Sequence, residues 1–296
     1  METVLSVLVV GILLGAIYAL ASIGLNLIFG VIRIVNFAQG ELLMLGMYGA
    51  FLCASMLKLD PYLSILVVVP AMFLFGVIIQ RLVIQPLQAE STMQIFATFG
   101  LLTILQNVVL LFTRGEGYSV SSKLAQLSIG LGEIRVSGTR LIVLLSTTLI
   151  ALGLHWFLTR TLAGKSIRAV AQDREAARLM GIDVERTFML TFGIGSALAG
   201  LAGVLLAPIY TLAPGIGGNF ILAAFAVVVL GGLGSVAGAY FGGMIVGIVE
   251  AFAGYYIDPE LKQAFWFVIF LAVLVIRPSG LFGQVGAEEV GFREQT

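Results

Sequence analysis

The chain has 296 residues, of which 59% are apolar and only 11% are charged, and its mean hydropathy is +1.08. A soluble domain carries roughly a quarter charged residues, so this composition excludes a water-soluble globular protein. Sixteen Lys and Arg side chains balance sixteen Asp and Glu side chains, and this balance gives no reason to expect a nucleic-acid partner. The composition predicts an all-α polytopic membrane protein that is in contact with lipid.

Nine apolar segments are separated by polar breaks, and most of them approach the roughly 20 residues that span a bilayer. The segment 219–232 is short and ends in a glycine pair, so a re-entrant or broken helix is the alternative there. The sequence therefore predicts a single transmembrane domain over 1–296 with eight or nine crossings. The expected spans are 4–29, 37–57, 62–84, 93–113, 140–158, 187–210, 219–232, 235–256 and 263–276.

The basic residues predict the orientation. Six of the sixteen lie within 160–186, and the excess of basic residues in cytoplasmic loops places that segment in the cytoplasm. Counting outward puts the N-terminus outside, together with the loop 114–139, although that loop carries Lys123 and two arginines. The tail after Arg277 is polar and is expected to be poorly ordered.

Glycines recur at a spacing of four inside several spans, for example Gly11 with Gly15, and Gly243 with Gly247. Without water to drive helices together, small residues that let backbones approach closely are what packs membrane helices. The pattern predicts a tightly packed bundle.

Catalytic, metal and cofactor sites are not predicted. The single cysteine, Cys53, excludes an intrachain disulfide and a cysteine metal cluster. Gly164 begins a Gly-Lys-Ser triplet like the end of a phosphate-binding loop, but Thr159 stands where that loop needs glycine. Two acids, Glu41 and Glu250, are expected near enough to span ends to reach the interface, with a proton-relay role as the less favoured alternative.

The segment 160–186 predicts a helix over 166–180, stopped by Gly181 at a C-cap, with Asp183 as the N-cap of the next helix. Its apolar face is expected to hold four residues, and the charged side chains point elsewhere. The expected apolar residues are Ile167, Val170, Ala177 and Met180, and the charged ones are Arg174, Glu175 and Arg178. The segment is interpreted as a docking helix for a cytoplasmic partner; a solvated connecting loop is the alternative.

Several sequence blocks resemble one transporter family. The segment Glu175-Ala176-Ala177, followed by Gly181-Ile182, looks like the Glu-Ala-Ala…Gly loop of ATP-binding-cassette importer permeases. Over residues 5–283 the chain resembles the branched-chain amino acid permeases, specifically their H-type subunit. Gln39 and Arg33 depart from the family pattern, where histidine and a small residue are common. The further matching blocks are 24–30 (GLNLIFG), 36–41 (NFAQGE), 229–235 (VLGGLGS) and 277–283 (RPSGLFG).

The resemblance implies a permease subunit of an importer in the bacterial or archaeal cytoplasmic membrane, working by alternating access. Its implied partners are a second similar permease, two cytoplasmic ATPases that bind the ATP, and an extracytoplasmic solute-binding protein. Leucine, isoleucine and valine are the typical cargo, while relatives carry urea, short amides or aromatic acids. An autonomous carrier or channel is the alternative function. The residues expected to couple the chain to the ATPases are Arg174, Glu175, Ala176, Ala177, Gly181 and Ile182.

A zwitterionic amino acid needs polar contacts on its way through an apolar bundle, and no basic side chain is expected inside a span. Uncharged polar residues are therefore the candidates for the translocation pathway, with weak contacts, and helix-to-helix hydrogen bonds are their alternative role. The candidates are Asn26, Asn36, Gln39, Thr98, Gln106 and Asn107.

Overall fold

The computed structural model describes residues 2–88, 90–122, 128–131, 134–258, 260–277 and 279–283. The predicted disorder of the C-terminal tail and the charge of Lys123 concern positions outside these ranges. The elements are α1 (Glu2–Ile32), α2 (Gln39–Leu57), η1 (Pro61–Ser64), α3 (Ile65–Ile79), η2 (Gln80–Ile84), η3 (Gln85–Leu87), α4 (Ser91–Thr113), β1 (Ser128–Leu131), β2 (Ile134–Ser137), α5 (Gly138–Arg160), α6 (Leu162–Gln172), α7 (Arg174–Leu179), α8 (Val184–Leu206), α9 (Ile216–Gly231), α10 (Val236–Tyr256) and α11 (Lys262–Ile276).

Every predicted span coincides with a helix, which confirms the polytopic helical fold. Within the described ranges, seven helical stretches are long and apolar enough to cross a membrane, and two shorter apolar helices, Ile216–Gly231 and Ala264–Ile276, accompany them. The third span is composite: η1, α3, η2 and η3 follow one another over Pro61–Leu87. Asp60 caps its start by accepting a hydrogen bond from the Tyr62 amide at 3.1 Å.

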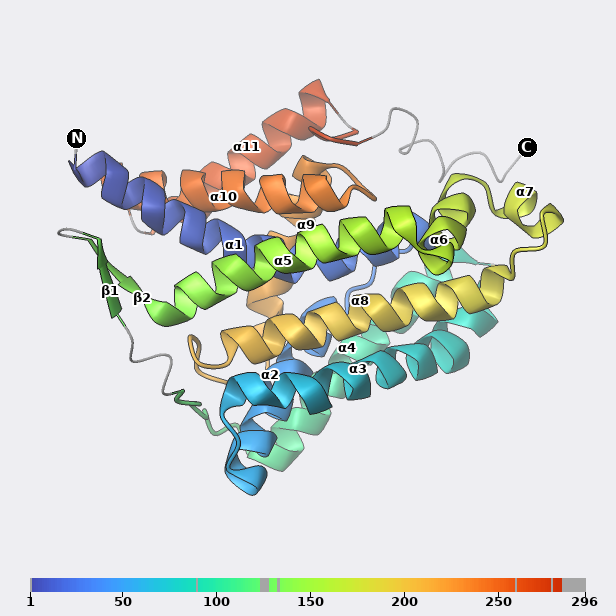
Figure 1. Ribbon diagram of the computed structural model, residues 1–296, viewed down its shortest axis with the longest axis horizontal. Helices are drawn as coiled ribbons and strands as arrows, with labels where there is room; N and C mark the ends of the chain where they lie inside the picture. The colour runs from blue at the N-terminus through green and yellow to red at the C-terminus, as the bar shows by residue number, and fades with distance from the viewer. Residues whose placement is uncertain are drawn as a thin grey trace.

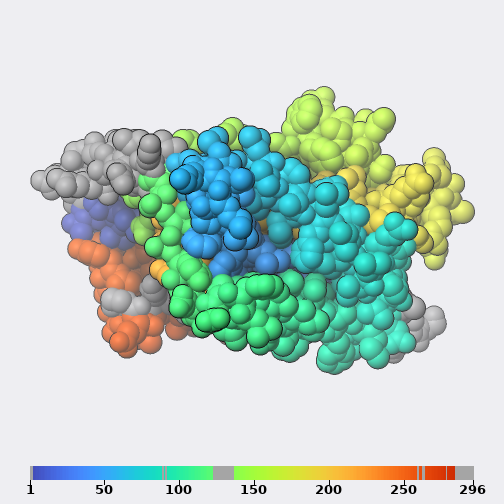
Figure 2. Space-filling model, turned by 90° about the horizontal axis from the view of Figure 1, so that it is seen from below, coloured from blue at the N-terminus to red at the C-terminus, as the bar shows by residue number. Residues whose placement is uncertain are grey.

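The two ends of the bundle differ in character (Figure 1). The N-terminus and the β1–β2 hairpin lie at one end, and α6 and α7 lie at the other. The hairpin pairs Ser128 with Ser137 and Leu131 with Ile134 in antiparallel register, and it is a local addition that the sequence did not predict. In the space-filling view, α6 and α7 protrude from the body of the molecule (Figure 2).

The central helix is α1, which packs against α8, α9, α10 and α5. Glycines make the closest of these contacts, as predicted. A Cβ atom on Gly247 would overlap the backbone of Gly15, and one on Gly15 would stand 2.9 Å from the carbonyl oxygen of Gly243. The α1–α10 contact is thus backbone against backbone, which is the geometry that small residues permit in membranes.

The α8–α9 link and α9 together make an unusual passage through the bundle. The link pairs Leu212 with Tyr118 in a two-bond bridge and then reaches Gly217, which lies against Gly40 at the start of α2. From there α9 runs behind α1 and α5 at a steep angle (Figure 1) and ends beside Asn26, where α10 begins. Residues 207–235 therefore carry the chain from one end of the bundle toward the other, as a broken seventh passage.

Candidate functional site

The segment between α5 and α8 forms two helices, so the single predicted helix over 166–180 is wrong. Thr161 caps α6 by accepting a hydrogen bond from the Gly164 amide at 3.0 Å. Asp173 ends α6 and caps α7, since its carboxylate accepts from the Ala176 amide at 2.9 Å while its own backbone is extended. An aspartate in this role favours a helix start over a helix interior, so the chain breaks there.

The predicted Gly181 stop is confirmed and forms a complete C-terminal motif. Gly181 has a φ of +83°, which glycine adopts without steric cost. Its amide donates to the carbonyl of Arg178 at 3.0 Å, and the Ile182 amide donates to the carbonyl of Ala177 at 3.0 Å. These are the two bonds of a Schellman motif, and they fix the direction in which the chain leaves α7.

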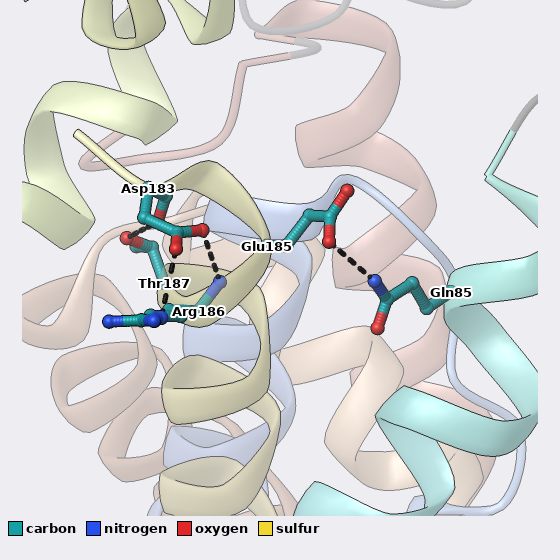
Figure 3. A network of polar contacts seen from close by, with 5 residues as sticks. All are labelled: Gln85, Asp183, Glu185, Arg186 and Thr187. Carbon is teal, nitrogen blue, oxygen red and sulfur yellow. Dashed lines mark hydrogen bonds and ion pairs between the residues drawn. The ribbon is translucent and has the colours of Figure 1, made fainter. Parts of the chain in front are cut away.

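Asp183 caps α8 as predicted (Figure 3). Its carboxylate accepts from the Arg186 amide at 3.0 Å and pairs with the Arg186 guanidinium at 2.9 Å. Two residues after Asp183, Glu185 accepts a hydrogen bond from Gln85 of η3 at 2.8 Å. The start of α8, at the end of the docking segment (residues 160–186), is therefore tied to the turn after α3.

The packing of the docking segment agrees with the prediction for Ile167, Val170 and Ala177, which are buried at 1%, 1% and 4% exposure. Met180 was placed on the same face but is 82% exposed. The break at Asp173 rotates α7 relative to α6, so a single helical period cannot place residues of both helices.

Arg174 was expected off the apolar face of the helix, and its side chain nevertheless packs against the bundle. Its guanidinium donates to the carbonyl oxygen of Ile32, the last residue of α1, at 2.5 Å, and lies 5.1 Å from the ring centroid of Phe188. In return, the Arg33 guanidinium donates to the carbonyl oxygen of Ala171 at 3.0 Å. We name this pair of reciprocal bonds, Arg33 to Ala171 and Arg174 to Ile32, the arginine clasp.

The clasp holds the start of the α1–α2 link, residues 33–38, which folds back into the bundle. Gln39 at the start of α2 lies beside Gly24 of α1: its Nε2 atom is 2.9 Å from where a Cβ on Gly24 would stand. Since Gly24 precedes the end of α1 by about eight residues, the Gln39 side chain reaches a point about 12 Å inside that end.

Polar side chains stabilise this link. Asn36 accepts from the Ala38 amide at 3.1 Å and donates to Gln39 at 3.2 Å, and Gln39 donates to the Gly195 carbonyl of α8 at 3.3 Å. Thr98 of α4 donates to the Val35 carbonyl at 3.2 Å. Three of the six pathway candidates, Asn36, Gln39 and Thr98, thus meet at one place.

The other three candidates lie apart from it. Asn26 is 1% exposed and bonds to the turn between α9 and α10, accepting from the Gly234 amide and donating to the Ser235 carbonyl, both at 2.6 Å. Gln106 is half-buried beside Gly215, in the link that leads to α9. Asn107 is exposed and donates to the Thr103 carbonyl of its own helix at 2.8 Å.

Two buried acids correct the prediction that they reach the interface. Glu41 is 2% exposed because the α1–α2 link carries the start of α2 inside the bundle. Glu250 is 4% exposed because it faces α1, where it accepts a hydrogen bond from Tyr18 at 2.5 Å. Across the described ranges, no group of three or more His, Cys, Asp or Glu side chains comes together as a metal site.

Exposed apolar residues on the docking segment escaped the sequence analysis. Leu162 is 82% exposed and Leu179 is 88% exposed, although both are large aliphatic side chains. Leu179 follows Glu175 by one helical turn, so both lie on the side of α7 away from buried Ala177. The sequence shows that Leu179 and Ala177 lie on different faces of the helix. It does not show which of the two faces is buried, so the exposure of Leu179 could not be predicted.

A cavity of about 580 Å³ lies at the opposite end of the bundle, beside the end of α2. Lys58, Asp60 and the segment 119–122 line it, and Ser122 donates to the Asp60 carboxylate at 2.9 Å. The lining mixes polar and apolar side chains, and it lies next to the Tyr118–Leu212 bridge.

Comparison with known proteins agrees with this architecture. The family model described as branched-chain amino acid transport system / permease component matches residues 7–274. The BraD branched-chain amino acid transport permease of Pseudomonas aeruginosa is 33% identical, over 96% of this chain and 97% of the relative. The corresponding LivH protein of Escherichia coli is 33% identical over 95% and 96%, and a probable LivH of Methanocaldococcus jannaschii is 31% identical over 89% and 88%.

No solved structure matches the chain. The matched relatives are transport permeases and not enzymes, and their similarity runs through both the docking segment and the α1–α2 link. The chain is a multi-pass membrane protein and belongs to the family of branched-chain amino acid transport permease components.

Proposed function

We propose that this chain forms the translocation channel of an ATP-driven importer for branched-chain or related small amino acids, and that it works by alternating access. The full-length similarity to permeases named for branched-chain amino acid transport supports the cargo. A second similar permease, two cytoplasmic ATPases and an extracytoplasmic solute-binding protein complete the transporter. ATP binds to the ATPases, so this chain requires no cofactor of its own.

The docking segment carries the proposal. Its α7 presents the apolar side chains of Leu179 and Met180, 88% and 82% exposed, beside the exposed Glu175. Exposed apolar residues of this size, flanked by charge, are typical of a surface that a partner covers. The six proposed coupling residues, Arg174 to Ala177 with Gly181 and Ile182, form this surface and its attachment to α8.

The proposed orientation places the docking segment in the cytoplasm and the N-terminus outside the cytoplasmic membrane. The six basic residues of 160–186 support it through the positive-inside rule. The N-terminus and the docking segment lie at opposite ends of the bundle, in agreement with that assignment (Figure 1). The cavity beside Lys58 and Asp60 then opens outward, on the side of the solute-binding protein.

For the pathway, we assign Asn36, Gln39, Thr98 and Gln106 to the region that substrate passes. Their side chains are largely engaged with the protein itself, which supports weak contacts between these four side chains and the substrate, and a choice among amino acid side chains set mainly by the binding protein. Asn26 and Asn107 are the less central candidates, since one fixes a turn and the other bonds to its own helix.

Reconstitution tests this function. The chain is purified with its partner subunits, and leucine uptake into proteoliposomes is measured with and without ATP. We expect ATP-dependent uptake, and we expect Leu179→Asp to abolish co-purification of the ATPases. Arg186→Ala is the matched control, because Arg186 is 83% exposed on the neighbouring helix and its guanidinium pairs with Asp183 of the same helix start. Uptake by the chain alone, without ATP, would instead establish an autonomous carrier or channel.

A further inference from the structure

Glu41 is the one buried acid of the described residues whose burial the packing leaves unexplained. It is 2% exposed, and its Oε2 atom has no hydrogen-bond partner in the described part of the chain. Glu250 is buried to a similar degree, but Tyr18 donates to it at 2.5 Å. An ionisable side chain inside a membrane bundle is costly and marks a functional site by default.

A purely structural role for Glu41 is the capping of α2, and the geometry argues against it. A glutamate in the first turn can accept a hydrogen bond from the amide of the N-cap residue. In this helix the N-cap is Ala38, and its amide donates to Asn36 at 3.1 Å instead. The capping position is taken, which leaves the Glu41 carboxylate available for another partner.

Two helices begin next to the backbone of Glu41. A Cβ on Gly40 would overlap the carbonyl of Gly217, so the first turns of α2 and α9 are in direct backbone contact. Side chains on a helix point back toward its N-terminus, which places the Glu41 side chain over the first turn of α2. Helix N-termini present amides without intrahelical acceptors and the positive end of the helix dipole.

An acid beside two helix N-termini is complementary to a zwitterion. Helix N-termini bind carboxylate groups, and broken helices near the middle of transporters use them in this way. A buried carboxylate forms its strongest hydrogen bonds with a cationic donor. Phe37, just before α2, contacts Phe225, more than two turns into α9, with ring centroids 5.5 Å apart, which supplies an apolar wall along the contact between the two helices.

We propose that Glu41 binds the α-ammonium group of the transported amino acid, while the first turns of α2 and α9 bind its carboxylate group. This inference rests on the proposed import function. The site opens when α9 separates from α2, and the broken chain on each side permits that movement. The arginine clasp connects the α1–α2 link to the docking segment, so closure of the ATPases reaches this site.

The first experiment measures ATP-dependent leucine uptake in proteoliposomes with saturating binding protein. Glu41→Gln removes the charge and keeps the shape, and we expect uptake to fall at least tenfold while binding-protein-stimulated ATP hydrolysis persists. Glu41→Asp keeps the charge and is expected to recover part of the uptake. Glu250→Gln is the matched control: its amide oxygen still accepts from Tyr18, and uptake stays within twofold. Full uptake by an assembled Glu41→Gln transporter would overturn the proposal.

A second experiment uses the wild-type transporter and decides the matter even if the Glu41 variants fail to assemble. Ligands are supplied on the ATPase side of the membrane, where the binding protein cannot select them, and ATP hydrolysis is measured. We expect leucine to inhibit, and 4-methylpentanoate, which is leucine without its ammonium group, to need at least tenfold higher concentration. Equal potency, or no inhibition by leucine, would refute the ammonium site. Wild-type uptake without ATP would refute the import function itself.

Discussion

Asn26 gives the sharpest test of whether a buried polar residue serves structure or substrate. Its side chain accepts from the Gly234 amide and donates to the Ser235 carbonyl, both at 2.6 Å, and it is 1% exposed. Asn26→Ala leaves both backbone groups without these partners. Each unsatisfied buried group costs about 1–3 kcal/mol, but hydrogen bonds between membrane helices average only about 0.6 kcal/mol. We therefore expect a loss of about 2 kcal/mol in the free energy of unfolding.

The assay is the thermal stability of the purified transporter, followed by the fraction that stays monodisperse after heating. At about 2–4 °C per kcal/mol, Asn26→Ala should lower the transition by about 4–8 °C. Asn107→Ala is the control and should leave it unchanged, because Asn107 is exposed and bonds only to Thr103 of its own helix. An Asn26→Ala transporter of normal stability that imports a different set of amino acids would refute the structural role.

Two further predictions follow from backbone contact and from the arginine clasp. Gly247→Ala places a methyl group into the backbone of α1 and should abolish recovery of folded protein. Its control, Gly153→Ala, has nothing within 4 Å of the added Cβ and should stabilise α5 by about 0.5–1 kcal/mol. Equal yields of the two variants in a detergent-extraction assay would contradict this prediction. Arg33→Ala and Arg174→Ala should each reduce ATP-driven uptake, and their double variant should lose less than the product of the two effects, because both break one clasp. Strictly multiplicative losses would show that the two arginines act independently.

The spans and caps were predictable because each depends on local sequence. Apolar length alone located all nine helical spans. Gly181 and Asp183 were recognisable because a left-handed residue after a helix and a carboxylate before one are local solutions to unpaired backbone groups. The nearby break at Asp173 was not predicted, because the helical spacing of apolar residues continues on both sides of it. The structure shows that Asp173 has an extended backbone and that its carboxylate caps a new helix.

The positions of Glu41 and Arg174 were not predictable, because both depend on how the chain returns after α1. Distance from a span end seemed to place Glu41 near the surface, but the helix end itself lies inside the bundle. Arg174 belongs to a charged segment, yet its partners are the end of α1 and Phe188 of α8. The spacing of residues within one segment cannot predict contacts with segments that are distant in the sequence.

The short α1–α2 link determines how movement of the docking segment reaches the interior. Residues 33–38 are held at both ends: Arg33 bonds to Ala171 in the clasp, and Asn36 bonds to Gln39, which bonds to Gly195 of α8. A shift of the clasp therefore displaces the start of α2 unless the link is lengthened.

Inserting two glycines between Ile34 and Val35 adds about 7 Å of reach and should uncouple the transporter. ATP hydrolysis stimulated by the binding protein should persist, while leucine uptake should fall several-fold. The same insertion between Gly115 and Glu116, in the exposed turn after α4, is the control and should leave uptake per ATP unchanged. Full uptake with the lengthened link would show that the force travels through α8, whose start is tied to the same segment by Asp183.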